Sequence, residues 1–422
     1  MTEPADLPII VQKFGGTSVA TTDRIERVAD RVLRTQKAGY RVVVVVSAMG
    51  KSTDDLVTMA ERITRRPGGR EMDMLYTTGE RVTMSLLAMA IAEEGGKARS
   101  FTGSQAGIIT DDIHGKAKIL RITPQRVLDC VNAGEIAIVA GFQGVSENTK
   151  DVTTLGRGGS DTTAVALAAA LEADACEIYT DVDGVFSADP RIVPNARKLD
   201  RISAEEMLEM SAAGAGILQL RSVEFGRNHG VDIHVRSSFS QQPGTWVYAK
   251  EDEMEHAVIA GVAHDSSEAK ATLRSIPDRP GVSAAIFSAL ADANVNVDMI
   301  VQNVSESAKT DMTFTFPESD RDTVERVLHP VAAALGSPGF EIEDRIGKVS
   351  LVGAGMKTNP GVAAKMFEAL RDANINIQII STSTIRVSVV IDEDDIDEAV
   401  RAIHAAFGLD GDQAVAVEGS RG

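Results

Sequence analysis

The sequence is poor in cysteine and aromatic residues and has no long hydrophobic run. Only Cys130 and Cys176 are cysteines among the 422 residues, which allows neither a disulfide framework nor the ligand spacing of a metal site. No apolar run approaches the roughly 20 residues that a membrane-spanning helix needs. The first residues, MTEPADLPII, also lack the basic and apolar regions of a signal peptide. We therefore expect a soluble, unprocessed protein of the reducing cytoplasm.

Positive charge is also scarce. The chain has 43 Lys and Arg against 61 Asp and Glu, a formal net charge of -18. Such a charge repels phosphate backbones and anionic lipid, so nucleic acid and membranes are not expected partners. The hydrophobic fraction of 43% suits a folded protein, and the length favours two to four domains. An anionic substrate must then be held by a few local donors, which makes lysines, arginines and glycine-rich loops informative.

Apolar strands alternate with amphipathic helices over the first part of the chain, up to about residue 240. This alternation predicts a largely parallel sheet covered by helices, with the site built from loops that follow the strands. A first helix is expected at about Thr22 to Ala38. Strands are expected at Ile9 to Lys13, Arg41 to Val46, Ala98 to Thr102, Ile136 to Ala140, Ala175 to Thr180 and Val231 to Val235. The stretch Gln241 to Glu255 contains Pro-Gly, charges and the only Trp, and predicts a domain boundary.

The remainder of the chain contains an internal repeat. Asp278-Arg279-Pro280-Gly281-Val282 and Asn359-Pro360-Gly361-Val362 begin two copies whose matching residues lie 80 positions apart, as Pro280 and Pro360 do. In each copy a strand leads into the Pro-Gly turn, a helix, an Asn-[Val/Ile]-Asn turn and a second strand. The pattern predicts two α+β modules of the βαββαβ type. A repeat does not by itself imply a ligand, so two packed modules without a site remain an alternative.

Two glycine-rich loops carry the chemistry. In the first, Lys13 ends a strand and is followed by Phe14-Gly15-Gly16-Thr17-Ser18; in the second, Thr154 to Thr163 runs through Arg157 and three glycines into a helix. Glycines let backbone N–H groups approach phosphate oxygens, and a helix N-terminus favours an anion. Each loop alone is also compatible with an ordinary capped turn. Two such loops in one domain favour an anion-binding site.

These motifs, together with Ser47-Ala48-Met49-Gly50, Thr77 to Arg81, Gly141 to Gly144 and Thr180 to Arg191, resemble those of aspartate kinases of the amino-acid kinase superfamily. The repeat resembles tandem ACT domains, which bind amino acids. The resemblance implies a three-layer αβα amino-acid-kinase domain with a largely parallel sheet, followed by two ACT modules. The expected domains are a kinase domain at 1–248, a first module at 262–340 with 408–422 packing back onto it through a strand at Ala414 to Glu418, and a second module at 345–407.

The implied reaction is phosphorylation of the β-carboxylate of L-aspartate by ATP with Mg²⁺, the first step of lysine, threonine and methionine biosynthesis. Lys13 and Asp161 would be catalytic, Glu80 would meet the substrate ammonium and Arg157 its α-carboxylate. The implied substrate-binding residues are Ser47, Glu80, Arg157, Gly158, Gly159 and Ser160. The implied nucleotide-binding residues are Lys13, Phe14, Gly15, Gly16, Thr180, Asp181, Phe186, Ser187, Ala188, Asp189, Pro190 and Arg191. No protein ligand of the metal is assigned.

The ACT resemblance implies feedback by lysine, threonine or both. The implied effector-binding residues are Asp278, Arg279, Pro280, Gly281, Val282, Ser283, Asn296, Val297, Asp298 and Gln302 in the first copy, and Asn374, Ile375, Ser381 and Thr382 in the second. Because ACT modules bind effectors between copies, a homo-oligomer is expected, or an assembly with a truncated regulatory subunit that starts at Met254.

The sequence departs from the family at two positions. Gly216 stands where the family has a phosphate-directed lysine, and Arg221 or Lys13 could compensate. Thr384 replaces an acid of the second module and could change the effector. A weakened regulatory protein and a kinase of another amino-acid carboxylate, such as glutamate, therefore stay open as alternatives. Glu80 could also be a helix first-turn acid. His114, His229, His234 and His264 show no ligand spacing and are assigned no role.

Overall fold

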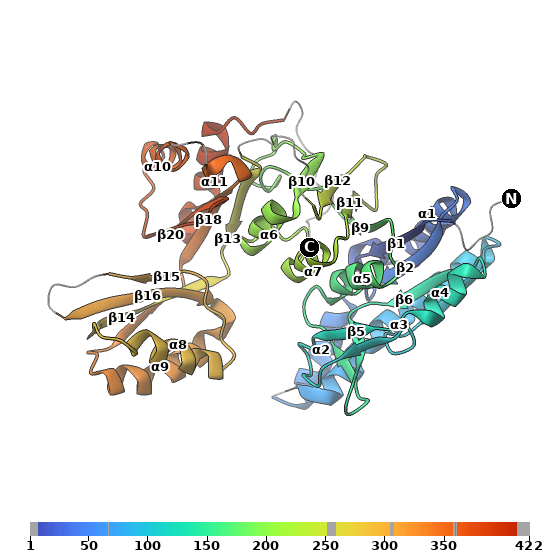
Figure 1. The fold of residues 1–422 in the computed structure, drawn as a ribbon, viewed down its shortest axis with the longest axis horizontal. Coiled ribbons are helices and arrows are strands. Elements are labelled where there is room, and N and C mark those ends of the chain that lie inside the picture. The colour runs from blue at the N-terminus through green and yellow to red at the C-terminus, as the bar shows by residue number, and fades with distance from the viewer. Residues whose placement is uncertain are drawn as a thin grey trace.

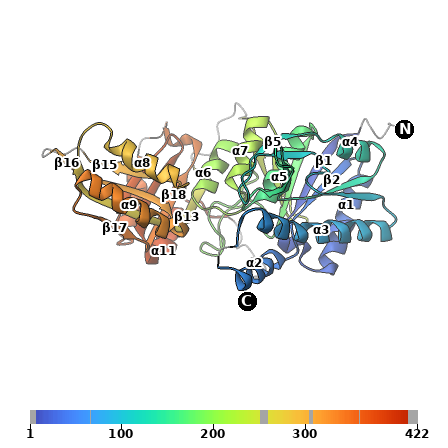
Figure 2. The same cartoon turned by 90° about the horizontal axis from the view of Figure 1, so that it is seen from below.

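The structure is a computed structural model that describes residues 7–65, 67–250, 259–303, 308–357, 359 and 361–411. Figure 1 shows a sheet domain built from the first part of the chain and two smaller modules built from the rest. Helix α6 (Ala204–Ala212) lies between the two halves in Figures 1 and 2. No helix among these residues is long and apolar enough to cross a membrane.

An eight-stranded sheet in the order β10-β12-β11-β9-β1-β2-β6-β3 forms the first domain. Every neighbouring pair is parallel except β11 and β12. The strands are β1 (Ile9–Phe14), β2 (Arg41–Val46), β3 (Ala98–Phe101), β6 (Ile136–Ala140), β9 (Ala175–Thr180), β10 (Arg201–Ser203), β11 (Ile233–Ser237) and β12 (Thr245–Tyr248). The predicted parallel-rich sheet is confirmed, and its central strands begin and end within a residue or so of the expected positions.

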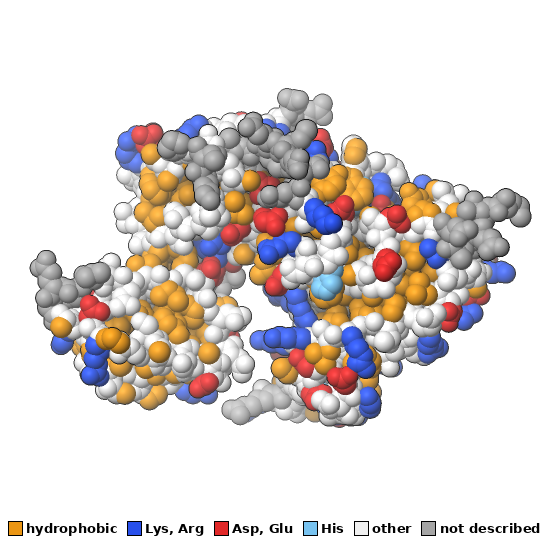
Figure 3. Space-filling model, in the orientation of Figure 1, with side chains coloured by type: hydrophobic (Ala, Val, Ile, Leu, Met, Phe, Trp, Pro, Cys, Tyr) orange, Lys and Arg blue, Asp and Glu red, His pale blue; other side chains and the backbone are white. Residues whose placement is uncertain are grey.

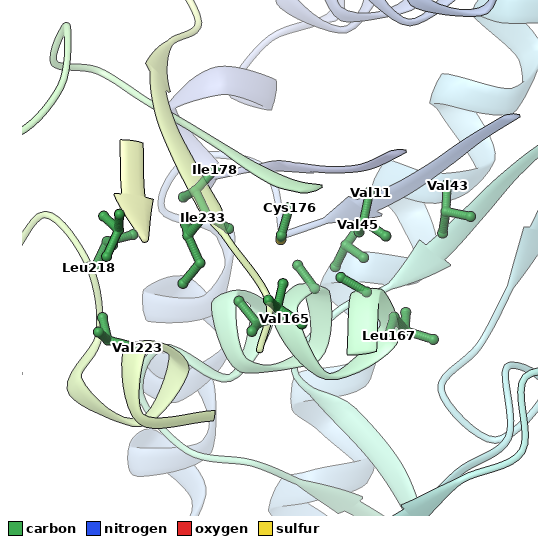
Figure 4. Close-up of a cluster of buried hydrophobic side chains, with 14 of the residues drawn as sticks. Val11, Val43, Val45, Val165, Leu167, Cys176, Ile178, Leu218, Val223 and Ile233 are labelled. Atoms are coloured by element: carbon green, nitrogen blue, oxygen red, sulfur yellow. The ribbon is translucent and has the colours of Figure 1, made fainter. Parts of the chain in front are cut away.

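Helices cover both faces of this sheet, which explains why its central strands are apolar at every position. On β2, Val43 and Val45 face one layer and Val42, Val44 and Val46 face the other. The first layer holds α4 (Gln125–Asn132), α5 (Gly159–Ala170), α6 and α7 (Leu220–His229); the second holds α1 (Thr22–Lys37) and α3 (Gly69–Glu93). Figure 4 shows the first core, where Val165 and Leu167 of α5 face Val11, Val45 and Ile178 of the sheet.

Helix α5 is buried on all sides because α7 covers the face that the sheet leaves open. After the polar first turn that contains Asp161, its sequence AVALAAA is accordingly apolar around the whole circumference. Smaller elements complete the domain. They are the 3₁₀ turn Gly16–Val19, α2 (Ser52–Ile63) and a four-stranded sheet of β4 (Ile108–Thr110), β5 (Ile119–Ile122), β7 (Gln143–Ser146) and β8 (Val152–Thr154).

The two repeat copies fold as α+β modules, each with a four-stranded antiparallel sheet. The first contains β14 (Glu268–Pro277), α8 (Val282–Asp292), β15 (Ile300–Gln302), β16 (Lys309–Pro317), α9 (Arg321–Leu335) and β17 (Phe340–Glu343). The second contains β18 (Ile346–Val352), α10 (Val362–Asp372), β19 (Ile379–Thr382), β20 (Arg386–Asp392) and α11 (Ile396–Ala406). The helix pairs α8 with α9 and α10 with α11 lie on opposite outer sides of the two modules, which we call together the regulatory half, residues 261–406 (Figure 1).

One strand differs from the predicted domain division. Strand β13 (Gly261–Asp265) precedes the first module in the chain but pairs antiparallel with β18, so it completes the sheet of the second module. The expected range of 262–340 had placed it in the first. It occupies the edge that β17 fills in the first module, because the repeat offers no equivalent strand between α11 and residue 411.

The C-terminal tail also differs in its described part. Asp410 forms a bridge with Ala196, and the Gly411 N–H donates to the Asn195 carbonyl at 2.7 Å. Residues 408–411 thus pack on the first domain and the second module, where Leu409 is buried, rather than on the first module. The expected strand Ala414 to Glu418 and the expected start at Met254 lie outside the described residues.

Candidate active site

The site lies where the carboxyl ends of the central strands meet. Strand β1 lies between β2, which the chain reaches through α1 on one face of the sheet, and β9, which follows α5 on the other face. Ligands of open α/β sheets bind beside such a switch point, outside the carboxyl ends of the strands. Both predicted glycine-rich loops reach this edge, since Lys13 is near the end of β1 and Asp161 is in the first turn of α5.

Lys13 and Asp161 form a buried ion pair, with Nζ 2.6 Å from Oδ1. Their side chains are only 11% and 12% exposed, so each charge depends on the other for solvation. The turn before α5 is shaped by glycine. Gly158 has a φ of 71°, and a Cβ there would lie 1.9 Å from the Cγ of Gln219. Only glycine can therefore hold this turn against Gln219 and leave the helix N-terminus open.

A first cavity, of about 210 Å³, opens beside this pair. Its lining contains the predicted residues Lys13, Gly16, Ser47, Glu80, Gly158, Gly159, Ser160 and Asp161. It also contains Ala48, Gly50, Thr53 and Phe142, to which the sequence analysis gave no role. Phe142 has a φ of 68°, rare for an aromatic residue, and the motif Gly141 to Gly144 was the available signal for it.

Glu80 is the most unusual group in this cavity. It lies in the interior of α3 and is 4% exposed, so the interpretation as a first-turn helix acid is wrong. Its Oε1 accepts a hydrogen bond from the Ala48 N–H at 3.3 Å, and its buried Oε2 has no partner among the described residues. Burial raises the pKa of Glu80 to about 7. A buried carboxylate oxygen without a donor is suited to a ligand ammonium group.

Three predicted residues of this region do not line the cavity. Arg157 is exposed, and its role toward a carboxylate stays a prediction. Phe14 is fully buried and stacks on Tyr179, with ring centroids 4.7 Å apart. The Gly15 N–H donates to the Tyr179 carbonyl at 3.3 Å. Phe14 and Gly15 thus shape the loop. Gly16 lies at the cavity wall, where an added Cβ would be 3.1 Å from the Ala48 carbonyl oxygen.

A second cavity, of about 300 Å³, is formed by the predicted nucleotide loop. The predicted residues on its lining are Thr180, Asp181, Phe186, Ala188, Asp189, Pro190 and Arg191. Asp189 and Arg191 pair with each other, with Arg191 Nη2 2.5 Å from Asp189 Oδ2. Burial opposes ionisation of Asp189, yet the hydrogen bonds and charge of Arg191 hold its pKa below the ordinary value.

Ser187 is the exception in this loop. Its hydroxyl contacts His404 Nε2 at 2.9 Å, donates to the Leu409 carbonyl at 3.0 Å and accepts from the Arg197 N–H. It is fully buried and does not line the cavity. The side chain therefore ties the loop to α11 and the tail, and its predicted contact with a nucleotide is replaced by this structural role.

Gly216 lies on the wall of the second cavity, and a Cβ there would meet no atom within 4 Å. Neither residue expected to compensate for the absent lysine does so in this structure. Arg221 donates to the carbonyls of Leu155 and Ala117, both at 2.9 Å, and lines neither cavity. Lys13 lies in the first cavity, paired with Asp161.

The predicted effector residues lie in turns and at the ends of helices and strands of the two modules. In the first module, the Ser283 hydroxyl donates to Gln302 at 3.2 Å, which joins the first turn of α8 to β15. Asp298 instead accepts from the buried Lys348 of the second module at 2.8 Å. In the second module, Thr382 and Thr384 line an open cavity with the turn that precedes α10. Of the predicted effector residues in that module, Asn374, Ile375 and Ser381 do not line it.

Metal ligands are not gathered in the described part of the chain, where no group of three or more His, Cys, Asp and Glu has a suitable arrangement. Mg²⁺ is commonly held by one or two carboxylates, water and the phosphates of the substrate. The carboxylates on the cavity linings are Glu80 and Asp161 in the first cavity and Asp181 and Asp189 in the second.

Comparison with known proteins identifies relatives of the whole chain. The profile of the amino acid kinase family matches residues 8–237, and ACT domain profiles match 271–333 and 349–407. An aspartokinase of Mycolicibacterium smegmatis is 56% identical over 423 residues, covering 99% of this chain and 100% of the relative. An aspartokinase of Corynebacterium glutamicum is 55% identical over 419 residues, covering 98% and 100%.

Solved structures agree with these relatives. The structure of E. coli aspartokinase III in complex with aspartate and ADP, in its R-state, matches with a TM-score of 0.81 and 28% identity, covering 94% of this chain and 99% of that one. The same enzyme with lysine and aspartate, in its T-state, gives a TM-score of 0.72 and 27% identity, covering 94% and 99%. The predicted kinase fold and the predicted ACT fold are both confirmed.

Proposed function

This chain belongs to the aspartokinase family of amino acid kinases, and from that premise we propose that it transfers the γ-phosphoryl group of ATP to the β-carboxylate of L-aspartate. The product is 4-phospho-L-aspartate, an acyl phosphate, formed in the first step of lysine, threonine and methionine biosynthesis. The observation that carries the substrate assignment is Glu80, whose Oε2 is buried in the first cavity without a donor. An α-ammonium group supplies that donor.

The first cavity orients the acceptor. With its ammonium on Glu80, an amino acid directs its carboxylates toward the N-terminus of α5, where Gly158, Gly159 and Ser160 line the wall. The positive end of the helix dipole and the open backbone favour anionic groups there. Arg157, exposed at the rim, is proposed to bind the α-carboxylate in two parallel hydrogen bonds. The β-carboxylate is then the nucleophile.

Phosphoryl transfer to a carboxylate depends on placing the two reacting groups and neutralising their negative charge more than on proton transfer. A carboxylate is ionised at neutral pH and attacks the phosphorus without a general base. The bond between the γ-phosphorus and the bridging oxygen breaks as the new phosphorus–oxygen bond forms, and ADP leaves. Lys13 stabilises the transferred group, and Asp161 holds the lysine in place at 2.6 Å. Mg²⁺ bound to the nucleotide phosphates adds further charge neutralisation.

The second cavity is the proposed nucleotide site. Its lining combines apolar residues such as Phe186 and Ile217 with the polar ends of Thr180 and Asp181. An apolar slot with a few polar groups suits a purine and a ribose. E. coli aspartokinase III, the structural relative, was solved with ADP and aspartate together.

Regulation by an amino acid is proposed for the ACT modules. A lysine complex of E. coli aspartokinase III in the T-state supports lysine as a candidate, and threonine is the second candidate. The unpaired edges of β15 and β19 expose Ile300 and Ile380, at 51% and 47%, in equivalent positions of the repeat. Exposed apolar side chains on open edge strands favour pairing with another chain. We propose a homo-oligomer, or an assembly with a truncated regulatory subunit, joined through these edges.

Trapping the acyl phosphate as hydroxamate tests the proposal. The unmodified chain, given MgATP and L-aspartate, should form aspartyl hydroxamate, and the Glu80→Ala variant should form little. L-glutamate in place of aspartate tests the alternative substrate, because Glu80 and Arg157 recognise groups common to both. A chain that forms product only as the Gly216→Lys variant would instead be a regulatory protein with a kinase fold.

A further inference from the structure

The second cavity is short of donors for a nucleotide phosphate. Among the described residues on its lining, the side chains that contain nitrogen are those of Arg191 and His264. Arg191 is already committed to Asp189 through its Nε and Nη2 atoms, at 2.5 to 3.0 Å. Gly216 contributes no side chain. The imidazole of His264 makes no hydrogen bond or ion pair within the described chain, so it is the nitrogen-containing side chain on this lining that has no partner of its own.

His264 reaches this cavity because β13 is part of its wall. Val262, Ala263 and His264 all lie on the lining, together with Gly214, Ala215 and Gly216 of the loop after α6. The two segments are in close backbone contact. A Cβ on Gly214, whose φ is 103°, would lie 2.0 Å from the carbonyl oxygen of His264. The absence of a side chain at Gly214 therefore allows β13 to approach the loop that ends beside Gly216.

His264 shares this lining with the polar residues Asp189 and Arg191. Its charge is one of the influences that hold the pKa of Asp189 low, after the hydrogen bonds and charge of Arg191. Its half-buried position leaves the ring accessible to a ligand in the cavity. No other element places a side-chain nitrogen here without a carboxylate partner, within the residues that the structure describes.

We propose that His264 is a nucleotide-binding residue, whose ring N–H donates a hydrogen bond to a phosphate oxygen of ATP at the position left open by Gly216. The assignment rests on the proposed function for the identity of the ligand. It places a residue of the regulatory half directly on the substrate of the kinase half. A neutral imidazole has one N–H and suffices for this contact.

Binding of MgADP, measured by titration calorimetry on the full chain, tests this role without requiring turnover. His264→Leu keeps a side chain of similar bulk but removes the N–H donor. It should weaken MgADP binding about tenfold or more, as expected for the loss of a hydrogen bond to a charged group. His264→Gln keeps an N–H donor and should stay within about threefold of the unmodified chain. Gly216→Lys in the His264→Leu background should restore MgADP affinity, because the lysine adds a cation to the same lining.

The matched control is His229→Leu, because His229 lies outside both cavities and bonds only the Phe225 carbonyl of its own helix. It should bind MgADP as the unmodified chain does. Unchanged affinity in His264→Leu, or an equal loss in the Leu and Gln variants, would overturn the assignment. The proposed function is judged separately, by hydroxamate formation: a chain that binds MgADP through His264 but phosphorylates no aspartate refutes the reaction and leaves the contact standing.

Discussion

Replacing Glu80 by glutamine should stabilise the free protein while weakening its binding of aspartate. The change keeps the size and shape of the side chain and removes a charge that is 4% exposed and has one hydrogen bond, from the Ala48 N–H. In the free protein the Glu80 carboxylate has lost its hydration, and no cation pairs with it among the described residues. In the aspartate complex the ammonium group supplies that cation, so the same substitution then removes a favourable ion pair.

The magnitude follows from the pKa. Burial raises the pKa of Glu80 from 4.5 to about 7, and a tenfold change in proton affinity corresponds to about 1.4 kcal/mol, giving roughly 3 kcal/mol at most. A raised pKa means that the folded protein binds more protons than the unfolded chain between pH 4.5 and about 7. The loss of folding stability caused by the buried Glu80 charge is therefore absent below pH 4.5, grows across this interval and is complete above about pH 7.

Thermal unfolding of both proteins at pH 5 and pH 8, with and without aspartate, measures this effect. At pH 8 without ligand, the Glu80→Gln variant should unfold several degrees higher than the unmodified chain, and the difference should shrink at pH 5. Saturating aspartate should raise the unfolding temperature of the unmodified chain and leave that of the variant nearly unchanged. A variant that is less stable at pH 8, or a difference that does not depend on pH, would refute the reasoning.

Four further substitutions follow from individual contacts. Lys13→Met should lower kcat about a hundredfold or more, and it should lower the unfolding temperature because Asp161 is left buried without its partner. Adding Asp161→Asn to this variant should restore the unfolding temperature but not turnover. Gly214→Ala should raise KM for ATP with little change in KM for aspartate, because its Cβ collides with the carbonyl of β13. Lys348→Met should cost about 3–5 kcal/mol in a denaturant titration, since it leaves two carboxylates of the regulatory half without their buried cation. Ile380→Lys should lower the sedimentation coefficient if the open edge of β19 joins two chains.

The sequence predicts best the elements that are buried on both faces. Ile136 to Ala140 and Ala175 to Thr180 were placed correctly to the residue, because a short apolar run between turns has few other solutions in an α/β domain. The motifs that contain Lys13, Glu80 and Asp161 also meet at one cavity, where Lys13 stands near the end of β1, Glu80 in α3 and Asp161 in the first turn of α5. These residues depend on local chain geometry, which sequence patterns describe well.

Side-chain direction in irregular segments was less predictable. The loop that contains Ser187 lines the second cavity as expected, yet the Ser187 hydroxyl turns the other way to contact His404, far along the chain. No spacing rule describes that pairing. Phe142 and Thr53 likewise reach the first cavity from elements whose approach depends on tertiary packing. His264 has no ligand spacing in the sequence, and it reaches the lining that contains Gly216 only because β13 pairs with the distant strand β18.

Strand β13 places the second module beside the proposed nucleotide cavity, since Val262, Ala263 and His264 line the second cavity and not the first. The nucleotide loop contributes Phe186, Ala188, Val193 and Ala196 to the same apolar core as α10, α11 and the sheet of the second module. The N–H of Val262 also donates to the Ser187 carbonyl at 2.7 Å. Because a shared, close-packed core transmits displacement, we expect the loop and the second module to move together. An effector that favours one placement of the module should then change the proposed nucleotide cavity, and a coupling of about 1–3 kcal/mol would be enough to alter ATP affinity severalfold to about a hundredfold.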